Sequence, residues 1–160
     1  MTQPTTRLPN KLSALLRLAV QDAQKCEAMP EKYRLDMRSW HQPSGSVCAV
    51  CMAGSVIAQT MSADELMEYE PEDFGDDADR LCAINYMRQG GFETALYYLT
   101  GEDEATEEQL SVFEEAEKLI RGSYVPDDPS ESAFSITDLF GRAPWPVYLQ
   151  VADLLEGAGL

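Results

Sequence analysis

Apolar residues that recur every three or four positions constrain the fold of this chain more than any other feature of its sequence. The clearest stripe comprises Leu12, Leu15, Leu16, Ala19, Ala23 and Cys26. That spacing places all six side chains on one face of a helix. The pattern therefore predicts a helix over 11–28, with Asn10 as its N-cap and Pro30 just beyond its end.

Similar patterns predict further helices along the chain. Thr106 and Gln109 match a capping box, in which each side chain bonds the other residue's backbone N–H. Pro146 suits the first turn of a terminal helix, where its missing N–H has no cost. We expect these helices over 46–61, 77–89, 92–99, 107–121 and from 146 onward, with a short helical turn over 63–67.

One segment has the alternation of a strand instead. Between residues 33 and 40, Tyr33, Leu35 and Met37 alternate with charged residues, which predicts a short, half-exposed strand. A turn is expected over 42–45. The residues over 46–50 fit either a second strand or the start of a helix. We favour the helix, because Val47, Val50, Cys51, Gly54, Ala58 and Met61 would share one of its faces.

These elements predict a mainly α fold. We expect one compact domain over 1–160, with five or six helices and one short β element near 33–40. Residues 1–8 are expected to form a loose tail and residues 156–160 a frayed end. A polar connection over 62–79, a loop over 124–135 and a helical turn over 135–140 complete the layout. A chain of 160 residues buries enough surface to fold without a disulfide or a metal.

The charge of the chain is its most unusual compositional feature. Its 28 acidic and 12 basic side chains leave a formal net charge of −16. Residues 1–41 carry a net charge of +3, and residues 42–160 carry −19. Such a field repels DNA, RNA and anionic membranes and attracts basic surfaces. We therefore expect no direct nucleic-acid binding, no membrane association and a protein partner with a basic surface.

The sequence predicts a cytoplasmic protein. The apolar stretch over 12–20 is interrupted by Arg17 and lacks the cleavage site of a signal peptide. The longest nearly apolar run, over 47–58, has twelve residues, too few to span a bilayer. The four cysteines are accordingly expected to be reduced thiols.

Two acidic blocks form the candidate binding face. Carboxylates spaced over a rigid surface resemble the phosphates of nucleic acid and can occupy the Lys/Arg groove of a nucleic-acid-binding protein. The simpler alternative is a highly soluble surface. The candidate residues are Asp64, Glu65, Glu68, Glu70, Glu72, Asp73, Asp76, Asp77, Asp79, Glu102, Asp103, Glu104, Glu107 and Glu108.

The cysteines allow four interpretations. Cys48 and Cys51 are spaced as a CxxC dithiol, which would suit a redox role. Cys48 and Cys51, completed by His41 and Cys26 or Cys82, would suit zinc, which prefers four thiolate or imidazole ligands. Cys48 could also pair with His41, the only histidine, as a nucleophile and its base. The simplest interpretation treats the cysteines as small core residues. Since the chain has one pair of cysteines and no paired zinc motif, we favour the core, with no cofactor and no enzymatic activity.

Three segments resemble a known group of proteins. They are the run over 12–26, Tyr33-Arg34-Leu35-Asp36-Met37 with Trp40, and the run over 47–58 that contains Cys48-Ala49-Val50-Cys51. Together with the helix end near Gly90, they resemble small uncharacterised acidic proteins of tailed bacteriophages and prophages, over about the first hundred residues. The resemblance brings no established activity.

The resemblance implies an accessory protein that works in the cytoplasm of an infected bacterial cell. Many such proteins bind and inhibit a host or anti-phage-defence protein, and the acidic blocks would then carry the contact. Another expectation is a structural interaction domain, such as a homodimer formed through the small residues of the 46–61 helix.

Overall fold

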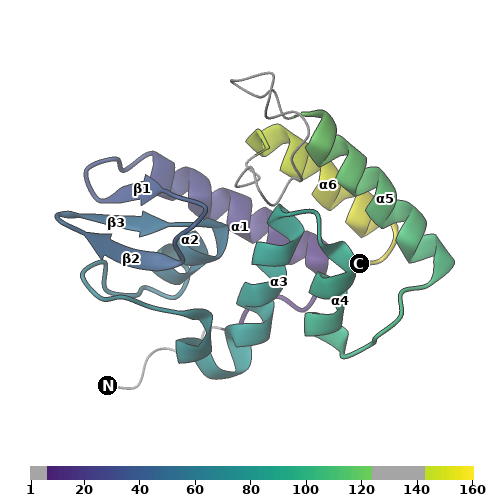
Figure 1. The fold of residues 1–160 in the computed structure, drawn as a ribbon, viewed down its shortest axis with the longest axis horizontal. Coiled ribbons are helices and arrows are strands. Elements are labelled where there is room, and N and C mark those ends of the chain that lie inside the picture. The colour runs from purple at the N-terminus through teal and green to yellow at the C-terminus, as the bar shows by residue number, and fades with distance from the viewer. Residues whose placement is uncertain (1–6, 124–142) are drawn as a thin grey trace.

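Six α-helices, one 3-10 helix and a three-stranded sheet make up the described part of the chain. The computed structural model describes residues 7–123 and 143–160. The sheet lies at one end of the molecule and helices α5 (Glu107–Gly122) and α6 (Trp145–Gly157) lie at the other, with α1 (Leu12–Glu27) running between them (Figure 1). The predicted mainly α fold with a short β element is confirmed. The loop predicted over 124–135 and the helical turn predicted over 135–140 lie outside the described residues.

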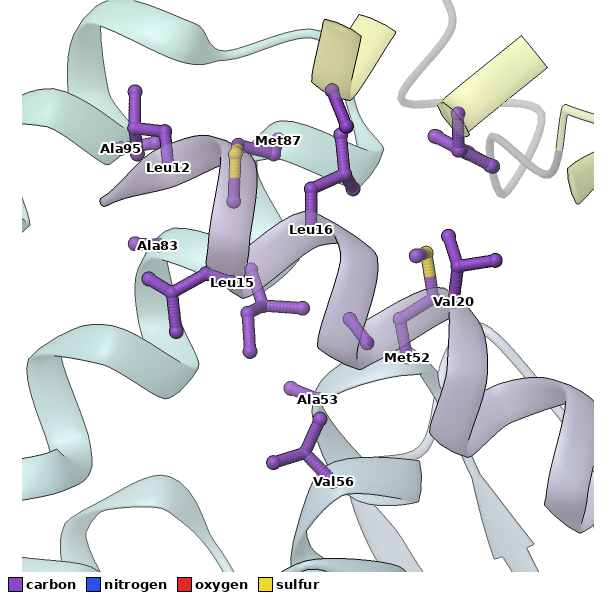
Figure 2. Packing of buried hydrophobic residues seen from close by; sticks show 14 of the residues in the cluster. Leu12, Leu15, Leu16, Val20, Met52, Ala53, Val56, Ala83, Met87 and Ala95 are labelled. Atoms are coloured by element: carbon purple, nitrogen blue, oxygen red, sulfur yellow. The ribbon is translucent and has the colours of Figure 1, made fainter. Parts of the chain in front are cut away.

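Helix α1 (Leu12–Glu27) lies at the centre of the hydrophobic core. Its predicted stripe is buried, and Leu15, Leu16 and Ala19 have no exposed surface. In Figure 2, Leu12, Leu15 and Leu16 of this stripe lie among side chains of the surrounding helices. The surrounding helices are α2 (Met52–Gln59), α3 (Ala78–Arg88), α4 (Phe92–Thr100) and α6 (Trp145–Gly157).

The predicted N-cap of α1 is wrong. The helix is capped at Lys11, without a side-chain hydrogen bond. The Asn10 side chain is engaged elsewhere, because its Oδ1 accepts from Nε of Arg80 at 2.9 Å. A hydrogen bond with Arg80, a residue 70 positions along the chain, therefore replaces the capping bond that the sequence predicts for Asn10.

The sheet contains β1 (Tyr33–Leu35), β2 (His41–Ser44) and β3 (Val47–Val50), in the order β1-β3-β2. Strand β3 pairs in parallel with β1 and antiparallel with β2. Pro43 lies on the edge strand β2, where its missing N–H is tolerated. The predicted strand over 33–40 is shorter than expected, because Asp36 begins a turn in which its carboxylate accepts from the Arg38 N–H.

The helix predicted over 46–61 begins too early, and the turn predicted over 42–45 is displaced. Residues 47–50 are the central strand of the sheet, and α2 begins only at Met52. A short apolar run is compatible with either a buried strand or a helix. Here both neighbouring strands bond its backbone. The chain reverses at Gly45, whose φ of +68° favours glycine.

Helix α2 packs closely against the backbone that precedes β2. Cys51 is its N-cap and accepts from the Gly54 N–H, and the Cys51 N–H donates to the Trp40 carbonyl at 3.3 Å. A Cβ added to Gly54 would lie 1.4 Å from that carbonyl oxygen. Only glycine therefore fits at this position.

The connection between α2 and α3 is more regular than predicted. No helix forms over 63–67; the Met67 N–H donates to the Asp64 carbonyl in a turn. Pro71 then opens a 3-10 helix, η1 (Pro71–Asp77), where Glu70 and Asp73 form a reciprocal capping box. Gly75, with φ of +55°, kinks the chain before α3.

The later helices follow their predicted signals. Helix α4 ends at Gly101, which is left-handed, and α5 (Glu107–Gly122) begins with the predicted capping box of Thr106 and Gln109. The buried face of α6 includes Tyr148, Val151 and Leu155. At the end of the chain, the backbone oxygen of Leu160 accepts from the Ser13 N–H at 3.3 Å. Near its beginning, Leu8 is only 2% exposed.

The close approach at Gly54 predicts a large loss of stability on substitution. We expect Gly54→Ala to lower the free energy of unfolding by at least about 2 kcal/mol, because the new methyl group overlaps the Trp40 carbonyl. Urea denaturation measures the change. Gly157→Ala is the control, since a Cβ there meets nothing within 4 Å. It should be neutral or stabilise by up to about 1 kcal/mol. Equal effects of the two substitutions would contradict the packing described here.

Candidate functional site

The predicted acidic residues are mostly at the surface. Twelve of the fourteen are exposed, Glu65 is half-buried and Asp77 is buried. Asp77 has a structural role, because its Oδ1 accepts from the Leu8 N–H at 3.0 Å and from the Arg80 guanidinium at 3.2 Å. Asp77 is therefore not available to a partner. The twelve exposed carboxylates are accessible at the surface.

The exposed candidate carboxylates form no ion pair with a basic side chain of the described residues. Within residues 7–123 and 143–160, Asp77 is the only one of the fourteen that forms an ion pair. Acidic residues outside the candidate set differ in this respect. Glu114 pairs with Lys118, Glu117 pairs with Arg121, and Asp153 and Glu156 both pair with Arg17. The candidate surface thus keeps its negative charge uncompensated by the described basic side chains.

Carboxylates of the first block are close enough to affect each other's protonation. The pKa of Glu70 is raised from 4.5, first by partial burial and then by Glu72, Glu68 and Asp73. The pKa of the Cys82 thiol is also raised, by burial and then by Glu72 and Asp79. The negative field of this block therefore extends over η1 and the first turns of α3.

The first block is anchored to the sheet. The Tyr69 N–H donates to the His41 carbonyl at 3.0 Å. The ring of His41, which is fully buried, forms a 3.0 Å hydrogen bond through Nδ1 to the Met67 carbonyl. Gln42 on β2 donates to Glu68 at 3.0 Å. These bonds hold the connection that carries the carboxylates against β2, the edge strand.

The second block belongs to a different part of the fold. It includes Glu102, Asp103 and Glu104 in the connection after α4, and Glu107 and Glu108 in the first turn of α5. Negative side chains at a helix N-terminus are stabilised by the helix dipole. In Figure 1, η1 and this connection lie along the same lower margin of the molecule, with α4 between them. The two blocks therefore lie on separate elements.

His41 and Cys48 are in contact, as the dyad hypothesis requires. They lie on adjacent strands, where Cys48 is paired with Pro43 and is thus a diagonal neighbour of His41 on the same face. The Cys48 Sγ lies 3.6 Å from Nδ1 and 3.7 Å from Nε2 of His41. A sulfur aligned with one nitrogen lone pair would be clearly farther from the other nitrogen. The near-equal distances therefore exclude a linear hydrogen bond to either one.

Burial keeps both members of this pair uncharged at neutral pH. It raises the pKa of the Cys48 thiol from 9.0 to about 11, with further increases from Cys26 and Glu65. It lowers the pKa of His41 from 6.5, although the hydrogen bond to Met67 opposes this change. A cysteine nucleophile needs a thiolate. This geometry does not supply the thiolate–imidazolium pair of a cysteine hydrolase.

The proposed zinc ligands do not form one cluster. Among the residues that the structure describes, no three or more His, Cys, Asp or Glu side chains are arranged to hold a metal ion. Cys51 caps α2 and belongs to the main core. Cys26 and Cys48 lie in a separate apolar cluster with Tyr33, Val50 and Ala58. In these positions the cysteines act as small hydrophobic residues.

The small-residue segment predicted to form a dimer interface is not on the surface. Every residue of α2 from Met52 to Ala58 is buried within the chain, against α1 and α3. A second copy of the chain cannot pack on this face. The proposed dimer through the 46–61 segment is therefore contradicted.

A hollow of about 530 Å³ lies between α5 and α6. Two carboxylates, Glu108 and Asp153, line it together with the half-buried Val112 and Leu154. None of the described residues that line it is a cysteine, a histidine or a basic residue. Its lining does not bring together an acid, a base and a nucleophile.

Sequence reasoning missed two surface residues within the first acidic block. Leu66 is 69% exposed and Met67 is 53% exposed. Both residues fall in the helical turn predicted over 63–67, and that prediction does not indicate their exposure. The available signal was the presence of two large apolar residues between Asp64, Glu65 and Glu68 in a polar connection.

No family model matches the chain, and no curated protein or solved structure matches it. None of the helices in the described residues is long and apolar enough to cross a bilayer.

The burial of the thiols predicts their order of reaction. At pH 7.5, Cys82, which is half-buried, should be alkylated first. Cys26, Cys48 and Cys51 should react only through opening of the structure, since each is at most 2% exposed. Mass spectrometry of iodoacetamide-treated protein, with and without urea, measures the order. Fast labelling of Cys48 in the native protein would restore the nucleophile hypothesis.

The buried histidine predicts a loss of stability in mild acid. Because the folded-state pKa of His41 lies below 6.5, the unfolded chain binds the proton more tightly. The free energy of unfolding should fall as the pH drops from about 6.5 through the folded-state value, by up to about 1.4 kcal/mol per pH unit. His41→Asn keeps an N–H donor and removes the titration. Urea denaturation between pH 7.5 and 5 should show the difference between the two proteins narrowing, and parallel profiles would contradict this.

Proposed function

We propose that the protein is a phage-encoded accessory protein that binds and inhibits a host or anti-phage-defence protein in the infected bacterial cytoplasm. The observation that carries the proposal is the group of exposed carboxylates without ion-pair partners in residues 64–79 and 102–108. The resemblance of the first hundred residues to small phage proteins supplies the biological setting. The partner would present Lys and Arg side chains.

The mechanism would be competition with nucleic acid. Carboxylates held on an anchored surface pair with the cations that otherwise bind phosphates, so the partner cannot bind both at once. The anchoring matters, because a preformed surface loses less conformational entropy on binding than a mobile one. The hydrogen bonds from His41 and Gln42 to the first block provide such anchoring.

The absence of ion pairs supports binding over stability as the role of these charges. Like charges on one surface repel each other and destabilise the folded chain. The pKa of Glu70 is raised first by partial burial and then by Glu72, Glu68 and Asp73, and this second contribution is a sign of the repulsion. A basic partner would relieve it, so part of the binding free energy would come from the repulsion removed.

A variant with four neutralised carboxylates tests the proposal. We expect Glu68→Gln, Glu72→Gln, Asp76→Asn and Asp79→Asn together to weaken binding by about tenfold or more, since each lost charge contact contributes up to about 1 kcal/mol. Partners are first captured from bacterial lysate in low salt, eluted in high salt and identified. The affinity of the identified partner and its competition with nucleic acid are then measured for each variant.

A second set of four substitutions provides the control. Glu114→Gln, Glu117→Gln, Asp153→Asn and Glu156→Gln change the net charge equally, but they remove carboxylates that already have cationic neighbours. Binding should then weaken much less. Equal weakening by both sets would show that net charge alone matters. Unchanged inhibition by the first set would overturn the proposal.

A further inference from the structure

Two apolar side chains project near the start of the first acidic block, between Glu65 and Glu68. Leu66 and Met67, here called the apolar tip, are the two most exposed large hydrophobic residues among those described, at 69% and 53%. Asp64, Glu65 and Glu68 are their acidic neighbours in the chain. Exposed apolar side chains rimmed by polar residues often mark an interaction site.

The backbone of the apolar tip is held in place. The Leu66 N–H donates to Oδ1 of Asp64 at 2.8 Å, and the Met67 N–H donates to the Asp64 carbonyl at 3.1 Å. The Met67 carbonyl is bonded to the buried His41 ring. The Tyr69 hydroxyl also contacts Sδ of Met67, at 3.6 Å. The side chains are therefore presented from a fixed turn, which lowers the entropy lost on binding.

Charge decides which apolar surface can meet the tip. A second copy of the chain would bring its own net charge of −16 against Asp64 and Glu68. An anionic membrane would be repelled for the same reason. A protein surface with an apolar strip between Lys and Arg side chains would match both the tip and its acidic rim. Protein interfaces commonly have this arrangement of an apolar centre and a polar rim.

We propose that the apolar tip inserts into an apolar strip of a basic amphipathic helix on the partner, while Asp64, Glu65 and Glu68 pair with the cations beside that strip. This inference rests on the proposed function and specifies the partner's chemistry. It also separates two contributions to binding. The carboxylates accelerate association and are weakened by salt, whereas burial of Leu66 and Met67 is much less sensitive to salt.

The experiment uses two synthetic helical peptides of identical composition. In the first, the leucines form one stripe flanked by lysines; in the second, they are distributed around the helix. Their affinities for the full chain are measured by fluorescence anisotropy in low and high salt. We expect the first peptide to bind more tightly, and Leu66→Ser with Met67→Ser to weaken it by about 30-fold at both salt concentrations. Binding of the second peptide should be unchanged by these substitutions.

The control is Leu110→Ser with Leu149→Ser, which removes two other exposed leucines, each 39% exposed. It should leave the binding of both peptides unchanged. Circular dichroism and thermal unfolding verify that each variant folds, which is expected because the altered side chains are at the surface. A control variant that weakens binding as much as the tip variant would overturn the inference.

The outcomes distinguish this inference from the proposed function. If both peptides bind equally and lose affinity only when Glu68, Glu72, Asp76 and Asp79 are neutralised, the apolar tip has no role and the basic-partner proposal stands. If neither peptide binds, the inference about the apolar tip is overturned, whereas the proposed function is decided by the capture from lysate and the four-carboxylate variant. If the tip variant abolishes a dimer detected by analytical ultracentrifugation, the occupant is a second copy and the inference is overturned.

Discussion

The burial of α1 is the constraint on which the rest of the structure depends. Its apolar face is enclosed by α2, α3 and α6, and β1 packs near its end. Leu15 and Leu16 have no exposed surface. Elements from distant parts of the chain pack on this helix. The need to cover its apolar face therefore determines how they are arranged around it. The hydrogen bond from the Ser13 N–H to the Leu160 backbone oxygen joins the first turn of α1 to the last residue. Apolar burial of this kind is the dominant favourable contribution to folding.

A core built in this way leaves the acidic residues at the periphery. Two of the exceptions, Asp22 and Asp77, are buried and bonded: Asp22 accepts from the Thr60 hydroxyl, and Asp77 from Arg80 and the Leu8 N–H. Burial raises the pKa of Asp22, which is the expected cost of removing a carboxylate from water. The exposed carboxylates of residues 64–79 form no ion pair within the described chain, although Asp64 and Glu68 accept hydrogen bonds. These negative charges contribute little to the stability of the fold. We attribute the excess of negative charge to a role in binding a partner.

His41 connects the sheet to the acidic surface. Its ring is buried against Cys48 and Tyr69, and its hydrogen bond to Met67 fixes the turn that carries the apolar tip. His41 and Cys48 resemble a catalytic pair only in their residue types. The sulfur is not aligned with either ring nitrogen, and burial raises the thiol pKa to about 11. The histidine instead positions a surface segment, which explains why a buried polar ring lies beneath an exposed loop.

The sequence by itself determined the elements whose signals are local. The stripe of α1, the capping box of Thr106 and Gln109 and the left-handed Gly101 each depend on residues within a few positions, so their helices were predicted correctly. The acidic composition likewise predicted a charged surface. The tertiary structure decided the rest. Residues 47–50 became a strand because β1 and β2 bond both sides of their backbone, and Asn10 lost its capping role to Arg80. The burial of Asp77 and the exposure of Leu66 result from packing between segments that are distant in sequence. Local periodicity does not predict such packing.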